Sequence, residues 1–108
     1  MNLQAASRTA LATAHLRAAH QLLDARPLLL DDPVAVPLLG RKAAQAIRDG
    51  AASHSTPWAR ALRSHVLLRS VFAEERLAAA AARGVGQYVV LGAGFDTFAL
   101  RQPAWARG

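Results

Sequence analysis

The sequence contains no cysteine, and this absence excludes disulfides and thiolate metal sites. Its longest apolar stretches are far shorter than the ~20 residues that a helix needs to span a bilayer. The first seventeen residues, MNLQAASRTALATAHLR, lack the long apolar run behind a basic start that marks a secretory signal. The sequence therefore predicts a soluble, cytoplasmic protein without a membrane partner.

Acidic residues are also scarce. Seven Asp and Glu stand against thirteen Lys and Arg, which gives a net charge of +6 and a pI of about 11.5. Such a balance invites a nucleic-acid interpretation. However, the basic residues are scattered, all but one are arginines, and no basic run is interleaved with aromatic residues. We therefore predict no nucleic-acid partner.

Helical patterns fill most of the chain. Capping residues, prolines in the first helical turn and terminating glycines predict helices over residues 4–24, 33–40, 41–49 and 57–83. Asp32 is most simply the cap of the second helix, with Pro33 in its first position. Thr56 and Pro57 repeat this signal before the longest helix, which Gly84 is expected to end.

The pattern changes after Gly84. The run Gln87–Leu91 is β-branched and aromatic, lies between glycines, and predicts a strand. Gly92, Ala93 and Gly94 follow as a turn, and a further helix is expected from Phe95. We therefore predict an α/β fold, divided into an N-terminal helical region (1–84) and the start of a Rossmann-like core (85–108).

A βαβ unit needs ~30 or more residues, whereas only fourteen follow Gly94. This comparison predicts that the chain is truncated. Glycines in such a turn let a ligand approach the backbone. The third glycine of the dinucleotide fingerprint would fall at Thr97, which disfavours a pyrophosphate-binding site. An ordinary strand-to-helix turn remains an alternative.

The segment QYVVLGAGFDTFALR (87–101) resembles the first cofactor motif of the leucine carboxyl methyltransferase family, and in particular its bacterial branch of S-adenosylmethionine-dependent methyltransferases. Residues 7–35 resemble the opening helix and D-P-x-A segment of that family. Residues 69–84, RSVFAEERLAAAAARG, resemble the helix before its first strand. The resemblance implies a Rossmann-like class I methyltransferase fold with additional N-terminal helices.

The resemblance also implies a set of cofactor contacts. Arg69 would hold the methionine carboxylate of S-adenosylmethionine, and Gly92, Ala93 and Gly94 would line its methionine and ribose portion. The acidic residue that binds the ribose would lie ~20 residues past the glycines, and the chain has none there. We therefore expect the 108 residues alone to be inactive and to bind the cofactor weakly or not at all.

The complete protein is expected to transfer a methyl group to a hydroxyl or carboxylate oxygen of a small or peptide-like acceptor. Its catalytic and acceptor-binding residues cannot be named from this sequence, and its oligomeric state is unknown. Two other functions remain open: a nicotinamide- or flavin-binding oxidoreductase, which Thr97 disfavours, and a helical fragment without activity.

Helical periodicity bears on Arg69 independently. At ~100° per residue, Arg69 falls in the middle of an apolar face that contains Trp58, Leu62 and Phe72, with Ala73 beside them. An arginine on a core face requires an anionic partner, and its guanidinium fork suits a carboxylate. The alternative is that Arg69 extends to solvent along its aliphatic stem. Arg76 lies on the same face, and its role is less clear.

Other polar residues give weaker indications. Asp32 could also face the active site. Asp96 and Thr97 could cap a helix or approach the cofactor loop. His65 is expected to pack in the core. The four histidines lack metal-ligand spacing, so no metal site is predicted, and Glu74 and Glu75 are expected on the solvated side of the long helix.

Overall fold

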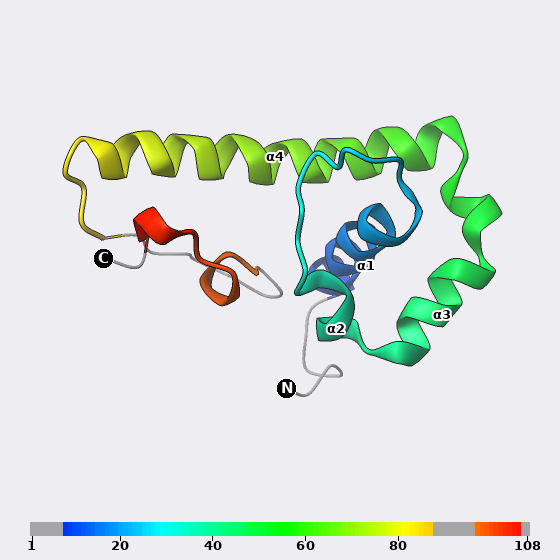
Figure 1. The fold of residues 1–108 in the computed structure, drawn as a ribbon. Helices are drawn as coiled ribbons and strands as arrows, with labels where there is room; N and C mark the ends of the chain where they lie inside the picture. Colours follow the sequence, from blue (N-terminus) through cyan, green and yellow to red (C-terminus); the bar gives the residue numbers. More distant parts are fainter. Residues whose placement is uncertain (1–7, 88–96, 107–108) are drawn as a thin grey trace.

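In the computed structural model, residues 8–87 and 97–106 are described, and every regular element among them is helical (Figure 1). The α-helices are α1 (Arg8–Leu23), α2 (Ala35–Leu39), α3 (Arg41–Asp49) and α4 (Pro57–Ala82). Short 3-10 turns are η2 (Ala51–His54), η3 (Phe98–Leu100) and η4 (Ala104–Ala106). No helix in the described part of the chain is both long enough and apolar enough to cross a membrane.

Helix α4 forms where its terminal signals predicted it. The Thr56 hydroxyl oxygen accepts a hydrogen bond from the backbone N–H of Ala59 at 3.1 Å, and Pro57 occupies the first turn, where no intrahelical N–H bond is needed. Beyond the helix, Gly84 has a φ of 95°, a left-handed value that glycine adopts without steric cost. Both predicted ends of the long helix are thus confirmed.

The short helices are also bounded by glycines. Gly40 separates α2 from α3 with a φ of 92°, and Gly50 ends α3. The second helix begins at Ala35 rather than at the predicted Pro33. Asp32 still satisfies a backbone donor at this end, because its carboxylate accepts a hydrogen bond from the N–H of Val34 at 3.0 Å.

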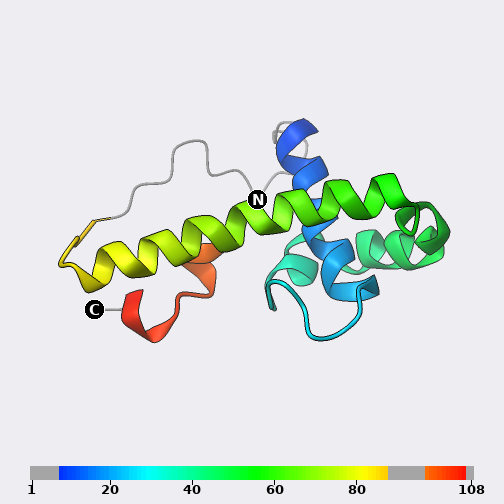
Figure 2. The same ribbon diagram turned by 90° about the horizontal axis from the view of Figure 1, so that it is seen from above.

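The hydrophobic core lies where α1 packs against α2 and α3, and the first half of α4 also contacts α1 (Figures 1 and 2). Small side chains dominate it, so the helices approach closely; its buried residues are Ala14, Ala18, Ala19, Leu39 and Ile47. The second half of α4 extends away from this core and is accompanied by the C-terminal segment that carries η3 and η4 (Figure 2). Only the first half of α4 therefore lies next to the core.

The predicted α/β fold class, with a first Rossmann-like strand, is wrong for this structure. Residues 8–87 and 97–106 form helices and connections without a strand, and Gln87, where the predicted strand would begin, is not in one. The rest of that predicted strand, with the glycine turn, lies outside the described residues. A helix satisfies its backbone hydrogen bonds internally, whereas a strand needs a paired neighbour, which the described residues do not supply. Local β propensity cannot provide that neighbour.

The end of the chain differs in a similar way. Where a helix was predicted from Phe95, the described residues contain only the 3-10 turn η3, which begins at Phe98. The proposed boundary between a helical region (1–84) and a following core (85–108) stays a prediction.

Candidate functional site

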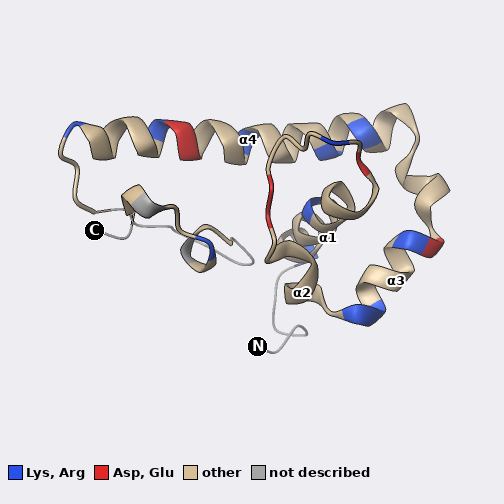
Figure 3. Ribbon diagram, in the orientation of Figure 1, with Lys and Arg blue, Asp and Glu red and all other residues tan. Residues whose placement is uncertain are grey.

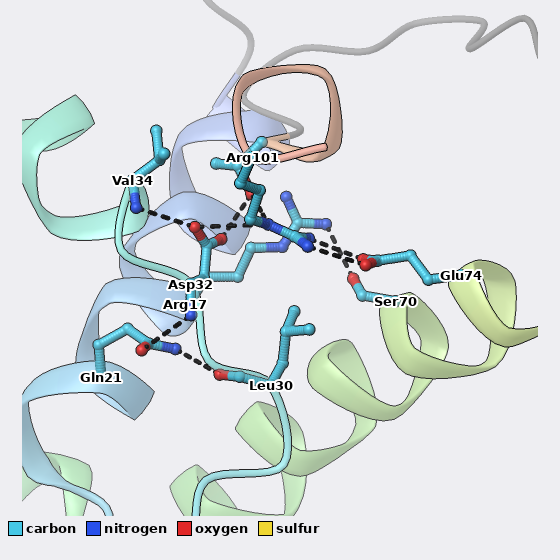
Figure 4. Close-up of polar contacts among 9 residues, drawn as sticks. Arg17, Gln21, Leu30, Asp32, Val34, Ser70, Glu74 and Arg101 are labelled. Carbon is cyan, nitrogen blue, oxygen red and sulfur yellow. Dashed lines mark hydrogen bonds and ion pairs between the residues drawn. The ribbon is translucent and has the colours of Figure 1, made fainter. Parts of the chain in front are cut away.

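A buried carboxylate, Asp32, joins the three stretches that carried the family resemblance (Figure 4). Asp32 is 1% exposed and Thr97, just after the glycine-rich segment, is 2% exposed. The Thr97 hydroxyl donates a hydrogen bond to Asp32 Oδ2 at 2.5 Å. The other carboxylate oxygen, Oδ1, accepts the bond from Val34 N–H and lies 3.5 Å from Nε of Arg101.

Arg101 extends this network to α4. Its two terminal nitrogens donate to the two carboxylate oxygens of Glu74 at 2.8 and 2.7 Å, while its Nε donates to the Thr97 hydroxyl oxygen at 2.9 Å. The guanidinium also lies 6.0 Å from the ring centroid of Phe98. Glu74 was predicted to be solvated together with Glu75. That prediction is wrong for Glu74, because a bidentate partner 27 residues away holds it in a partly buried position.

Arg17 of α1 reaches the edge of the same network (Figure 4). One of its terminal nitrogens donates to the Ser70 hydroxyl at 3.3 Å, and its Nε is buried without a hydrogen-bond partner among the described residues. One turn along α1, Gln21 holds the connection to α2. It donates to the Leu30 carbonyl at 2.7 Å and accepts from Asp32 N–H at 3.1 Å.

This network holds segments of the chain in position and is not a catalytic site. The carboxylate oxygens of Asp32 and Glu74 are engaged by neighbouring donors, so neither carboxylate is free to act as a base on a substrate. The network fixes the position of Thr97, three residues after Gly94, against α4 and the start of α2. The prediction that Asp32 caps the second helix is wrong, because the N-cap is Val34; Asp32 instead accepts the Val34 N–H just before the helix and forms the centre of a network.

A second polar cluster surrounds Asp24 at the end of α1. Arg63 of α4, whose side chain is 3% exposed, donates two hydrogen bonds to Asp24 at 2.9 and 2.7 Å and a third to the His54 carbonyl oxygen at 2.9 Å. His20 Nδ1 lies 2.7 Å from the same carboxylate. The hydrogen bonds from Arg63 are the main cause that lowers the pKa of Asp24 below its ordinary value of 3.8, and burial opposes them.

The face of α4 that was predicted to pack in the core is exposed instead. Trp58 and Phe72 are 76% and 60% exposed, Leu62 is also exposed, and so is His65, which was expected to be buried. The buried side of α4 is the opposite one, defined by Arg63 and Leu67. The apolar stripe therefore predicted the wrong buried face of α4. The two charged residues Arg63 and Glu74 are paired with Asp24 and Arg101 on the side that is buried.

Arg69 lies on this exposed face and forms no hydrogen bond or ion pair with the side chains that the structure describes. Two turns later, the guanidinium of Arg76 lies 5.2 Å from the ring centroid of Phe72, within the range of a cation–π contact. Gly92, Ala93, Gly94 and Asp96 lie outside the described residues. The predicted binding of one cofactor by Arg69 together with Gly92, Ala93 and Gly94 therefore stays a prediction.

Several residues of these clusters were not anticipated from the sequence. The sequence analysis assigned no role to four of them: Arg17, Arg63, Ser70 and Arg101. No local pattern indicates their contacts, because each forms a hydrogen bond with a residue at least 27 positions away or with a backbone group of another element. Basic residues are spread over α1, α3 and α4 (Figure 3), so charge alone does not single these out. No group of three or more potential metal ligands occurs in residues 8–87 and 97–106.

No curated protein and no solved structure is significantly similar to the chain. The sequence profile of the family described as leucine carboxyl methyltransferase matches residues 10–108, which is nearly the whole chain. Asp32, Glu74 and Thr97 lie within that match, as do nearly all residues of the three stretches that they connect. The chain therefore belongs to the leucine carboxyl methyltransferase family, whose members are S-adenosylmethionine-dependent methyltransferases.

Proposed function

We propose that this protein takes part in methyl transfer from S-adenosylmethionine to an oxygen nucleophile, a hydroxyl or carboxylate, on a small-molecule or peptide-like acceptor. Family membership over residues 10–108 is the observation that carries this proposal. The cofactor supplies a methyl group already activated by the sulfonium. The protein mainly has to align the reactants, which is the contribution that proximity and orientation make.

The chemistry of the exposed α4 face fits the cofactor's carboxylate. Arg69 offers a guanidinium that no described side chain engages, and a carboxylate is the group that its fork binds best. Exposed apolar surface from Phe72 and Leu68 lies on the same helix near it. We propose that Arg69 holds this carboxylate and that Gly92, Ala93 and Gly94 line the methionine and ribose portion.

The Asp32 network supports the same proposal indirectly. It fixes Thr97, three residues after Gly94, through hydrogen bonds between buried or partly buried side chains. Rigid support of this kind is what a binding loop requires if its backbone is to meet a ligand in a defined position. Asp32, Thr97 and Arg101 are therefore proposed as positioning residues.

We also propose a cellular location and the kinds of partner that the protein does without. The protein would work in the cytoplasm and act without a metal, a nucleic acid or a membrane. Family membership gives no support to the alternative of a nicotinamide- or flavin-binding oxidoreductase. The weak or absent cofactor binding expected of these 108 residues remains a prediction.

A heteronuclear NMR titration with S-adenosylmethionine tests both the cofactor and the role of Arg69, because it detects millimolar as well as micromolar binding. We expect Arg69→Gln to weaken binding about tenfold, the loss of one charged hydrogen-bonding partner. Arg48→Gln, an exposed arginine on α3, is the matched control and should leave binding unchanged.

The outcomes separate the two expectations. An equal loss of cofactor affinity in Arg69→Gln and Arg48→Gln would show that Arg69 does not contact the cofactor. An absence of any shift at millimolar cofactor would agree with the expectation that the 108 residues bind the cofactor weakly or not at all. Stoichiometric micromolar binding would instead contradict the expectation that the 108 residues bind weakly.

A further inference from the structure

A cavity of about 380 Å³ lies beneath the connection that follows α1, against the first turns of α4. Its apolar wall is formed by Leu23, Pro27 and Leu29, and its polar wall by Asp24 together with Arg60 and Ser64 of α4. The volume falls within the range of about 300–1,000 Å³ that is typical of small-molecule sites. Neither the methyl-transfer proposal nor the Asp32 network uses this cavity.

The acidic group of the cavity is already neutralised. Asp24 accepts two hydrogen bonds from the buried Arg63 and has His20 Nδ1 at 2.7 Å, so both of its oxygens are occupied. This pairing holds the pKa of Asp24 below its ordinary value and keeps the carboxylate in its ionised, paired form. Asp24 is therefore a fixed part of the wall rather than a free ligand for a cation.

Two other donors of the polar wall, Arg60 and Ser64, have no partner among the described residues. Arg60 and Ser64 are four positions apart on α4, so their side chains lie on the same side of the helix one turn apart. Neither the Arg60 guanidinium nor the Ser64 hydroxyl forms a hydrogen bond with a residue in 8–87 or 97–106. With His20 counted as neutral, two arginines against one aspartate leave the cavity with one positive charge in excess.

We propose that this cavity binds a small organic anion. A carboxylate or phosphate group of the ligand accepts hydrogen bonds from Arg60 and Ser64, and a short apolar body packs against Leu23, Pro27 and Leu29. A guanidinium and a hydroxyl one turn apart suit a group with several acceptor oxygens. The apolar wall distinguishes such a ligand from a bare inorganic anion.

This site is distinct from the proposed cofactor contact. Arg60 precedes Arg69 by nine residues, which is about 14 Å along the helix axis and half a revolution around it. A ligand held by Arg60 therefore lies on the other side of α4 from Arg69. The anion site consequently does not depend on the proposed methyl transfer.

The test is a heteronuclear NMR titration of the 108-residue protein with five probes: acetate, hexanoate, hexanamide, hexyl phosphate and inorganic phosphate. We expect hexanoate, hexyl phosphate or both to shift the amide signals of residues 23–29 and 60–64, and to bind more tightly than acetate and inorganic phosphate. The neutral hexanamide should not bind. Whichever of hexanoate and hexyl phosphate binds more tightly identifies the preferred head group.

Variants locate the contact. Arg60→Gln should weaken binding of the stronger probe about tenfold, and Ser64→Ala about threefold. Arg48→Gln on α3 should have no effect. Neither Arg60 nor Ser64 belongs to a buried ion pair, so both variants are expected to fold. Spectra of the ligand-free variants that match the spectrum of the native protein would verify this.

Three results would overturn the proposal. One is an absence of shifts in the cavity residues with every probe at millimolar concentration. Another is binding of hexanamide as tight as that of hexanoate. The third is an equal loss of affinity in Arg60→Gln and Arg48→Gln, which would indicate nonspecific attraction to a basic protein.

Discussion

Replacing Glu74 by Gln tests whether the C-terminal segment is held to α4 by the Glu74–Arg101 pair. The pair is bidentate, with N–O distances of 2.8 and 2.7 Å, and its side chains are only 21% and 11% exposed. A hydrogen bond to a charged group contributes about 1.5–3 kcal/mol, and an exposed ion pair contributes far less. Since this pair is mostly buried, we expect Glu74→Gln to lower the free energy of unfolding by about 2 kcal/mol.

Glu75→Gln is the matched control, because the neighbouring glutamate carries the same charge and is exposed on the same helix. It should change the free energy of unfolding by less than about 0.5 kcal/mol. Urea denaturation followed by far-ultraviolet circular dichroism measures both. In a double-mutant cycle, Arg101→Met should then add little to Glu74→Gln.

Similar losses in the two glutamine variants would refute the reasoning, because they would show that general charge rather than the pair stabilises the fold. Full additivity of Glu74→Gln and Arg101→Met would refute it as well. Either result would mean that the two side chains do not interact in solution as they do in the structure.

The pKa of Asp24 is lowered below 3.8 mainly by Arg63, so the stabilisation is present above that pH and lost as the pH falls through the lowered value. Urea denaturation between pH 2 and pH 7 should show this loss in the native protein, and Asp24→Asn should remove that part of the pH dependence. Leu67→Ala should cost about 2–3 kcal/mol, because the native side chain is fully buried. Leu68→Ala, at a position that is 52% exposed, should cost less than about 0.5 kcal/mol, and equal effects would contradict the observed orientation of α4.

The helices were predictable because their ends depend on neighbouring residues. Thr56 and Pro57 start α4, and Gly40 and Gly84 take the left-handed conformations that end helical segments. Each of these signals acts over four or five residues and requires no contact with the rest of the chain. The family assignment was predictable for the same reason, since it rests on short contiguous motifs.

The packing was less predictable, because it depends on pairs that are distant in the sequence. Asp24 and Arg63 are 39 residues apart, and Asp32 and Thr97 are 65 apart. Each pair turns a charged or polar residue inward, against the expectation from its hydrophobicity. Periodicity alone therefore assigned the inner face of α4 to the apolar stripe, whereas the structure assigns it to Arg63 and Leu67.

The contrast between Arg63 and Arg69 shows what decides the position of an arginine on this helix. Arg63 is buried because Asp24 supplies a carboxylate with two hydrogen bonds and the His54 carbonyl occupies a further donor. Arg69 lies beside exposed apolar residues, yet no described carboxylate reaches it, and it remains in solvent. Burial of a guanidinium without an anion would cost several kcal/mol. A surface that buried Arg69 on this face of α4 would have to bring an anion to its guanidinium, and we propose the carboxylate of S-adenosylmethionine as that anion.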